Sequence, residues 1–117
     1  MLRINPSDVV AAYTATGLIP IRKAWESVDG RGGCPFSALA QQMGEDSGES
    51  WAGRLDEHYT RGFIDAWDAD QPAILNETKN DKRYLIGYWD AIICRDAVEQ
   101  TFSSEVIEYN GKADPPS

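Results

Sequence analysis

Two segments of the chain carry the same residue pattern, and this repetition restricts the fold more than any other feature. Residues 59–66 read Tyr-Thr-Arg-Gly-Phe-Ile-Asp-Ala, and residues 84–91 read Tyr-Leu-Ile-Gly-Tyr-Trp-Asp-Ala. The shared pattern is Tyr, two residues, Gly, an aromatic residue, any residue, Asp and Ala. Because Tyr, Gly and Asp are three residues apart, they fall on one stripe of a helix surface. We therefore expect both segments to be helical and to make equivalent contacts.

Each copy places a glycine in the middle of its helix, at Gly62 and at Gly87. A glycine there costs about 1 kcal/mol relative to alanine, and close approach of another backbone compensates for that cost. If the helices cross antiparallel with the glycines opposite each other, each tyrosine faces the aspartate of the other helix. A buried carboxylate needs such a donor. The predicted hydrogen-bonded pairs are Tyr59 with Asp90 and Tyr84 with Asp65.

The same carboxylates allow a second interpretation, a site for a divalent cation. Asp65 and Asp90 would supply oxygen ligands, together with Asp68 or His58. Such a site usually takes more oxygen ligands than two aspartates provide. We therefore expect a structural role for these aspartates, with no metal and no other cofactor.

Proline and glycine mark the ends of two further helices. Asn5 can cap a helix that has Pro6 at its first position, and Gly17 is placed to end it. A second helix begins at Cys34-Pro35 and runs to Gly44.

Two longer helices follow. From Trp51 to Trp67 the apolar residues keep the spacing of a single helical stripe. The last helix covers residues 80–102, and apolar residues surround most of its circumference between Tyr84 and Cys94. This pattern predicts a mainly α fold of about four helices around a central helix 80–102, which should be the most buried one.

One or two short strands complete the prediction. Residues 18–28 alternate in polarity and include Pro20, which favours an edge strand, and residues 106–109 form a second candidate. The glycine-rich residues 29–33 are expected to form a turn. The whole chain, 1–117, is predicted to be a single helical domain with a frayed tail at 112–117.

The charge balance limits the partners of this domain. It has 19 Asp and Glu against 11 Lys and Arg, a net charge of −8. An acidic surface disfavours nucleic acids and anionic membranes, because both are bound by neutralising phosphates with basic side chains. A basic protein or a cationic ligand remains compatible with this charge, and so does acidic mimicry of a nucleic acid. The chain has no apolar run of membrane-spanning length and no signal peptide, so we expect a cytoplasmic protein.

A cysteine supplies the one candidate for catalysis. Cys34 lies at a predicted helix start behind a glycine loop and near Arg31, where a thiol pKa can be lowered, and His58 is the only histidine that could act as its base. Cys94 is expected in the core. Two cysteines and one histidine lack the fourth ligand of a zinc site. The glycine loop also lacks the ending of a phosphate-binding loop.

Aromatic residues exceed what a small core requires, with four Trp, five Tyr and three Phe. The candidates for ligand binding are Trp51, Tyr59, Tyr88 and Trp89. They favour a non-enzymatic acidic binding or protein-interaction module. The protein could form a homodimer in which the two copies cover each other's surplus apolar surface. A small cationic or aromatic ligand is a variant of this hypothesis. The alternatives are a small enzyme that uses Cys34 with His58, and the nucleic-acid mimic.

Several segments together resemble a known group of proteins. These are the stretch Ala12–Pro20, the Cys-Pro helix start and the two Tyr-x-x-Gly-aromatic-x-Asp segments. They look like small bacterial proteins of no assigned function from mobile or environmental gene pools. This resemblance implies no reaction and no catalytic residue.

Overall fold

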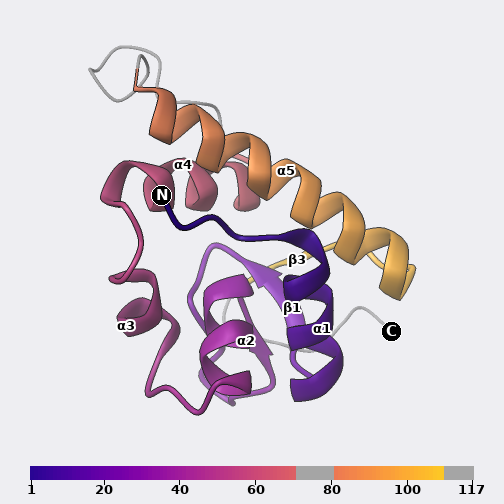
Figure 1. Cartoon of the computed structure of the whole chain (residues 1–117). Coiled ribbons are helices and arrows are strands. Elements are labelled where there is room, and N and C mark those ends of the chain that lie inside the picture. Colours follow the sequence, from indigo (N-terminus) through magenta and orange to yellow (C-terminus); the bar gives the residue numbers. More distant parts are fainter. Residues whose placement is uncertain (71–80, 110–117) are drawn as a thin grey trace.

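The computed structural model describes residues 1–70 and 81–109 (Figure 1). Its elements are, in chain order, α1 (Pro6–Thr16), β1 (Ile19–Arg22), β2 (Gly32–Gly33), α2 (Pro35–Gln42), α3 (Gly48–Ala52), α4 (Glu57–Trp67), α5 (Lys82–Phe102) and β3 (Ile107–Glu108). The mainly α prediction is confirmed. The predicted tail at 112–117 lies outside the described residues.

The predicted helix ends follow from local capping. The Asn5 side chain accepts hydrogen bonds from the backbone of Ser7 and Asp8, with Pro6 at the first position of α1. Gly17 ends that helix in the left-handed conformation, with φ of 70°. Helix α2 begins at Pro35, as expected, but ends at Gln42, two residues before Gly44.

The single helix expected from Trp51 to Trp67 is instead two helices, α3 and α4. The reason is a second cap. The Asp56 carboxylate accepts hydrogen bonds from the backbone N–H groups of His58 and Tyr59, which starts a new helix there. The apolar periodicity continues across this break, so periodicity alone could not show it.

The strands form a small parallel sheet in the order β2-β1-β3, so the edge position expected for residues 18–28 is wrong: β1 is the central strand and pairs on both sides. The strand expected over residues 18–28 is confined to β1, because Lys23 adopts a positive φ of 74° and ends it. Part of the predicted glycine turn is β2, which pairs with Ile19 and Pro20. Strand β3 lies inside the expected range 106–109 and pairs with Ile21 and Arg22.

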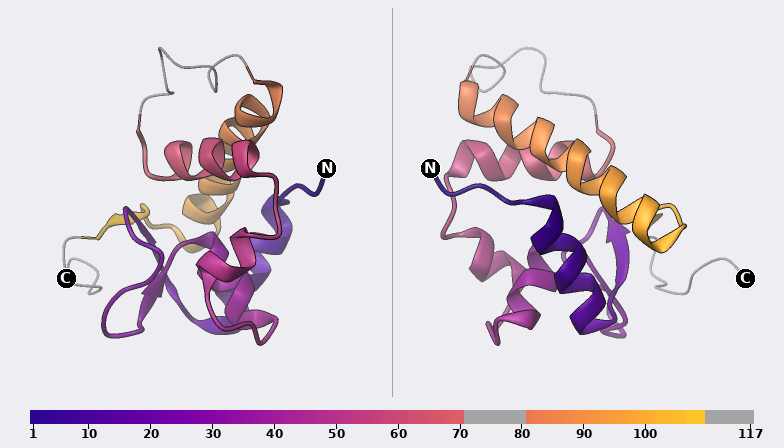
Figure 2. Two further views of the ribbon diagram at one scale, coloured as in Figure 1. Left: turned by 90° about the vertical axis from the view of Figure 1, so that its left-hand side faces the viewer. Right: turned by 45° about the vertical axis from the view of Figure 1, so that its right-hand side comes forward.

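The elements are arranged in two layers (Figures 1 and 2). Helices α4 and α5 pack against each other in one layer, and α1, α2, α3 and the sheet form the other. Helix α1 packs on both α2 and α5 and so joins the layers. The largest side chains that are fully buried between them include Tyr13, Phe36, Tyr59, Phe63 and Trp67.

The expectation of α5 as a central, most buried helix is not confirmed. Its buried residues form one stripe, made of Tyr84, Gly87, Asp90, Ala91, Cys94 and Val98. The other side of the helix is open to solvent, although it carries large apolar side chains. Apolar residues therefore surround α5, but only those on one side of the helix are buried against the rest of the chain.

Candidate functional site

Helices α4 and α5 cross in direct backbone contact. A Cβ placed on Gly62 would lie 2.0 Å from the carbonyl oxygen of Tyr84, and a Cβ on Gly87 would lie 2.0 Å from that of Tyr59. No side chain larger than hydrogen fits at either point. The two glycines are the close approach that the repeated pattern predicts.

Both hydrogen bonds predicted at this crossing are present. The Tyr59 hydroxyl donates to Asp90 Oδ2 over 2.7 Å, and the Tyr84 hydroxyl donates to Asp65 Oδ2 over 2.6 Å. The repeated motif therefore forms a pseudo-twofold contact, with one tyrosine–aspartate pair on each side of the glycines. This site holds two helices together and leaves no room for a ligand at its centre.

One of the two pairs also fixes the N-terminal segment. Arg3 donates to Asp90 through Nε at 3.0 Å and Nη2 at 2.7 Å, and the Ile4 backbone N–H donates to the Tyr59 hydroxyl at 2.8 Å. Burial by itself raises the pKa of Asp90, but the hydrogen bonds from Arg3 and Tyr59 outweigh it and hold that pKa below its usual value. The sequence reasoning missed Arg3, because the repeat predicts contacts only between its two copies.

The aspartates do not form the alternative cation site. Asp65 and Asp90 are each engaged with a different tyrosine on opposite sides of the crossing. The third candidate, Asp68, accepts a hydrogen bond from the Lys23 backbone, and His58 lies 3.9 Å from the Asp81 carboxylate. Within residues 1–70 and 81–109, no group of three or more His, Cys, Asp or Glu could hold a metal ion.

The surroundings of Cys34, the candidate for catalysis, do not favour its activation. The thiol is buried, 6% exposed, and this burial raises its pKa to about 11. In the described part of the chain no hydrogen bond or ion pair joins Cys34 to His58, and the Cys34 sulfur instead lies 3.9 Å from the Ser37 hydroxyl. A neutral thiol with no base beside it is a poor nucleophile. Cys94 is fully buried in the core, as expected.

The four candidate aromatic residues do not converge on one site. Tyr59 is completely buried at the crossing and cannot contact a ligand. Trp51 packs on Phe36 at a ring distance of 6.1 Å, and the Tyr88 hydroxyl donates to the Asp70 carbonyl. Trp89 is 62% exposed.

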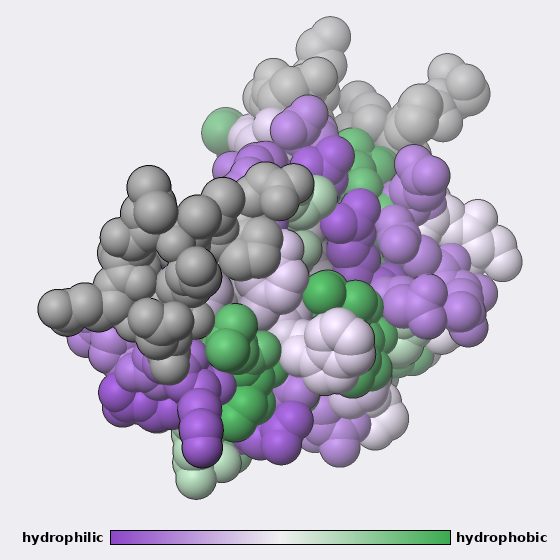
Figure 3. All heavy atoms as spheres, turned by 90° about the horizontal axis from the view of Figure 1, so that it is seen from above, coloured by the Kyte–Doolittle hydropathy of each residue, from purple (hydrophilic) through white to green (hydrophobic). Residues whose placement is uncertain are grey.

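Trp89 belongs to a group of apolar side chains on the outer side of α5. We call this group the α5 stripe; it consists of Leu85, Trp89, Ile92 and Ile93. Their exposed fractions are 48, 62, 40 and 41%. Figure 3, viewed onto the layer of α4 and α5, shows several apolar patches on this face, separated by pale and polar areas. Large exposed apolar patches mark interaction sites.

The residues that the structure describes also line cavities away from the crossing. One, of about 210 Å³, lies between the segment after β1, the start of α2 and the end of α4. We call it the aromatic pocket, and it is lined by Lys23, Ala24, Trp25, Cys34, Pro35, Phe36, Ile64, Trp67 and Asp68. Another, of about 250 Å³, lies between the N-terminal segment, α1 and α2, with Trp51 in its wall.

Comparison with known proteins gives no further guidance, since no family model, no curated protein and no solved structure matches the chain. Within the described residues, no helix has the length and apolar character needed to cross a membrane.

Proposed function

We propose that this protein is a non-enzymatic interaction module that associates with a second copy of itself through the α5 stripe. The observation that carries the proposal is the exposure of Leu85, Trp89, Ile92 and Ile93 on one side of a long helix. The neutral, buried thiol of Cys34 supports the non-enzymatic part, because that thiol was the only candidate nucleophile.

The position of the α5 stripe on the helix suits a helix–helix interface. Leu85, Trp89 and Ile92 are four and three residues apart, the spacing of the apolar positions in paired helices. At 100° per residue, they point away from the stripe of Tyr84, Gly87, Asp90, Ala91, Cys94 and Val98 that packs against the rest of the chain. Helix α5 therefore offers one face to its own fold and the opposite face to a partner.

The α5 stripe is complementary to itself when two copies meet antiparallel. A twofold axis at Trp89 places the two Trp89 side chains together and sets Leu85 opposite Ile93 of the second copy. The same register sets Lys82 opposite Asp96. Both of these charged residues are exposed, and within the described residues Lys82 forms no ion pair. Charge complementarity in this register favours a second copy over an unrelated partner.

The test replaces Trp89 with aspartate and measures the mass in solution by sedimentation equilibrium over a range of protein concentrations. Burying a large apolar side chain contributes about 1.5–3 kcal/mol, and Trp89 occurs twice at the axis. Trp89→Asp is therefore expected to weaken the dimer by at least a hundredfold. The matched control is Val28→Asp, an apolar residue that is 94% exposed outside α5, which should leave the dimer unchanged.

A charge exchange tests the antiparallel register. Lys82→Glu should weaken the dimer by placing two carboxylates together, and the double variant with Asp96→Lys should restore it. A wild-type protein that is monomeric at all concentrations would refute the proposal. So would a dimer that Trp89→Asp and Val28→Asp weaken equally.

A further inference from the structure

The aromatic pocket has three large aromatic side chains among its lining residues. Its walls include Trp25, Phe36 and Trp67, and the rings of Trp25 and Phe36 are 5.7 Å apart. The Trp67 indole N–H donates to the Ile21 carbonyl over 2.7 Å, so this ring is held in one orientation. The pocket is thus a preformed space with mainly apolar and aromatic walls, which is typical of a small-molecule site.

The size of the pocket limits its occupant. A cavity of about 150 Å³ with apolar walls is known to hold a benzene molecule. The aromatic pocket, at about 210 Å³, has room for one six-membered ring and a short substituent. A larger ligand such as a nucleotide would have to extend out of it into solvent.

One carboxylate lies at the polar side of this space. Asp68 follows the last residue of α4 and is partly buried; its Oδ1 accepts the Lys23 backbone N–H at 2.7 Å. Among the described residues, no hydrogen bond reaches its other oxygen, Oδ2. Burial raises the pKa of Asp68, as expected for a carboxylate that lacks full solvation. This oxygen can accept a hydrogen bond from a donor inside the pocket.

The surrounding charges favour a cation over an anion. The Lys23 ammonium also lines the pocket, but it is paired with Asp70. The Arg22 guanidinium donates to the Asp68 carbonyl and lies 3.7 Å from the Glu108 carboxylate. Each basic group near Asp68 therefore has a further acidic partner, and the charge of the Asp68 carboxylate remains in excess.

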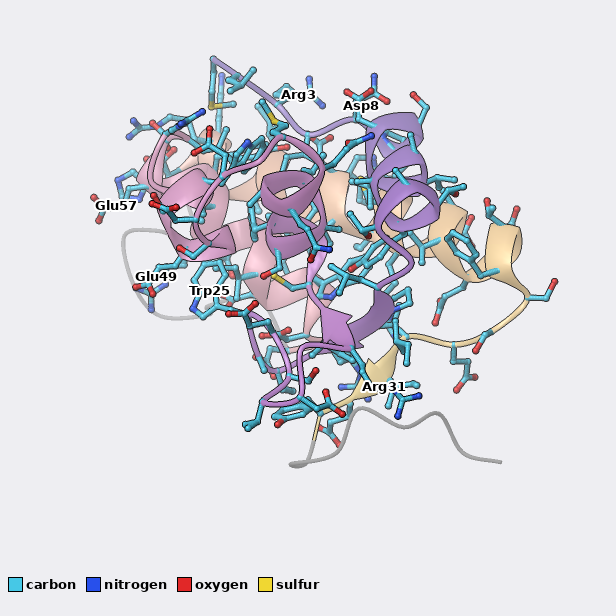
Figure 4. All side chains as sticks on the ribbon, turned by 90° about the horizontal axis from the view of Figure 1, so that it is seen from below. Arg3, Asp8, Trp25, Arg31, Glu49 and Glu57 are labelled. Carbon is cyan, nitrogen blue, oxygen red and sulfur yellow. The ribbon has the colours of Figure 1, made fainter. Side chains whose placement is uncertain are left out.

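Figure 4 shows the molecule from the side on which Trp25 lies. The acidic side chains of Glu49 and Glu57 point outward on the same side as Trp25, whereas Arg31 points outward elsewhere, near the strands. Two carboxylates therefore lie on the side of the molecule that carries Trp25.

We infer that the aromatic pocket binds a small monocationic aromatic amine, with its ring against the wall formed by Trp25, Phe36 and Trp67 and its ammonium on Asp68. The ring buries apolar surface, and the ammonium gains a charge-assisted hydrogen bond to Oδ2 together with attraction to the faces of the aromatic rings. The neutral Cys34 thiol contributes only an apolar contact surface to the wall of the pocket. This site is separate from the α5 stripe and does not depend on the proposed dimer.

The test compares two probes of the same shape, benzylamine and benzyl alcohol, by isothermal titration calorimetry at pH 7. Benzylamine carries the ammonium and benzyl alcohol does not. The wild-type protein is expected to bind benzylamine about tenfold more tightly, because a hydrogen bond to a charged group is stronger than one between neutral groups. Equal affinity for the two probes, or no saturable binding of benzylamine up to 10 mM (about 10⁻² M, far weaker than typical ligand affinities), would overturn the inference.

Two variants locate the site. Asp68→Asn keeps an acceptor for the Lys23 backbone and should abolish the preference for benzylamine, whereas Glu49→Gln removes an equal charge outside the pocket and should retain it. Trp25→Ala should lower the affinity for both probes by about the same factor. The inference fails if the Asp68→Asn variant, shown by circular dichroism to be folded, keeps the tenfold preference for benzylamine. It also fails if Glu49→Gln loses that preference as completely as Asp68→Asn does. It also fails if Trp25→Ala binds both probes as the wild type does.

Discussion

The contact of Gly62 with α5 gives a sharp test of how this fold is held together. In Gly62→Ala, the new Cβ would lie 2.0 Å from the Tyr84 carbonyl oxygen, whereas real Cβ atoms essentially never come closer than 3.0 Å to such a neighbour. The helices must therefore separate by about 1 Å, since the close-packed backbone cannot absorb the overlap. The corresponding substitution on the other helix, Gly87→Ala, makes the equivalent overlap with Tyr59.

The expected loss of stability follows from three contributions. Overpacking costs about 3 kcal/mol at the upper end of its usual range. Weakening the two tyrosine–carboxylate hydrogen bonds costs about 1 kcal/mol each, and the better helix propensity of alanine returns about 1 kcal/mol. The net loss is about 4 kcal/mol for either glycine. This is a large part of the roughly 5–15 kcal/mol that stabilises a domain.

The measurement is urea unfolding followed by circular dichroism, at one protein concentration so that any dimer contributes equally. The matched control is Gly53→Ala, where the nearest atom to a new Cβ would be the Ser50 carbonyl oxygen at 3.3 Å, and the change should be below about 1 kcal/mol. The double variant of Gly62 and Gly87 should lose less than the sum of the two singles, because the first substitution has already separated the helices. A loss below about 1 kcal/mol in both single variants would refute the proposed role of the crossing.

Three further outcomes follow from the same geometry. Tyr59→Phe should destabilise the protein by about 1–3 kcal/mol, because the Tyr59 hydroxyl both donates to the Asp90 carboxylate and accepts the Ile4 backbone N–H; thermal unfolding beside the wild type measures the loss, and an unchanged melting temperature would contradict it. Arg3→Ala should lower the free energy of unfolding at neutral pH, and its difference from the wild type should become smaller in acid. The folded-state pKa of Asp90 is lowered, so its contribution is present above about pH 4 and is lost as the pH falls through that pKa; urea titrations at pH 7 and pH 2.5 (well below the usual aspartate value of about 3.9) measure it, and an equal difference at both pH values would contradict it. The Cys34 thiol, with its pKa raised to about 11, should react with a thiol reagent more slowly than a small model thiol at pH 7 and at the model rate in urea, whereas fast labelling of the folded protein would reopen the enzymatic hypothesis.

The sequence predicts a contact well where a residue at a given position has only one common structural role. A glycine in a helix needs a close neighbour, and a buried aspartate needs a donor, so the residue pattern alone was enough to place Gly62, Gly87 and the two tyrosine–aspartate pairs. The start of α1 follows in the same way from the capping residue Asn5, and the start of α2 from Pro35 at its first position. These inferences depend on local chemistry and on the assumption that the two helices cross antiparallel with their glycines opposite each other.

Other features depend on tertiary contacts that no local signal encodes. Gly32 and Gly33 have no strand propensity and form β2 only because β1 lies alongside. The circumference of α5 is apolar in sequence, but one side is left open because α4 and α1 pack only against the other. The aromatic pocket joins Asp68 to Trp25 across 43 positions, and neither residue reveals the other.

The hydrogen bonds of Arg3 have a consequence for the order in which the protein is made. Arg3 and Asp90 are 87 positions apart in the chain, so the N-terminal segment leaves the ribosome long before its partner exists. Closing so long a loop is slow, and contacts between distant positions form late in folding. The N-terminal segment therefore reaches its final place only after the part of α5 that carries Asp90 has been made and has left the ribosome.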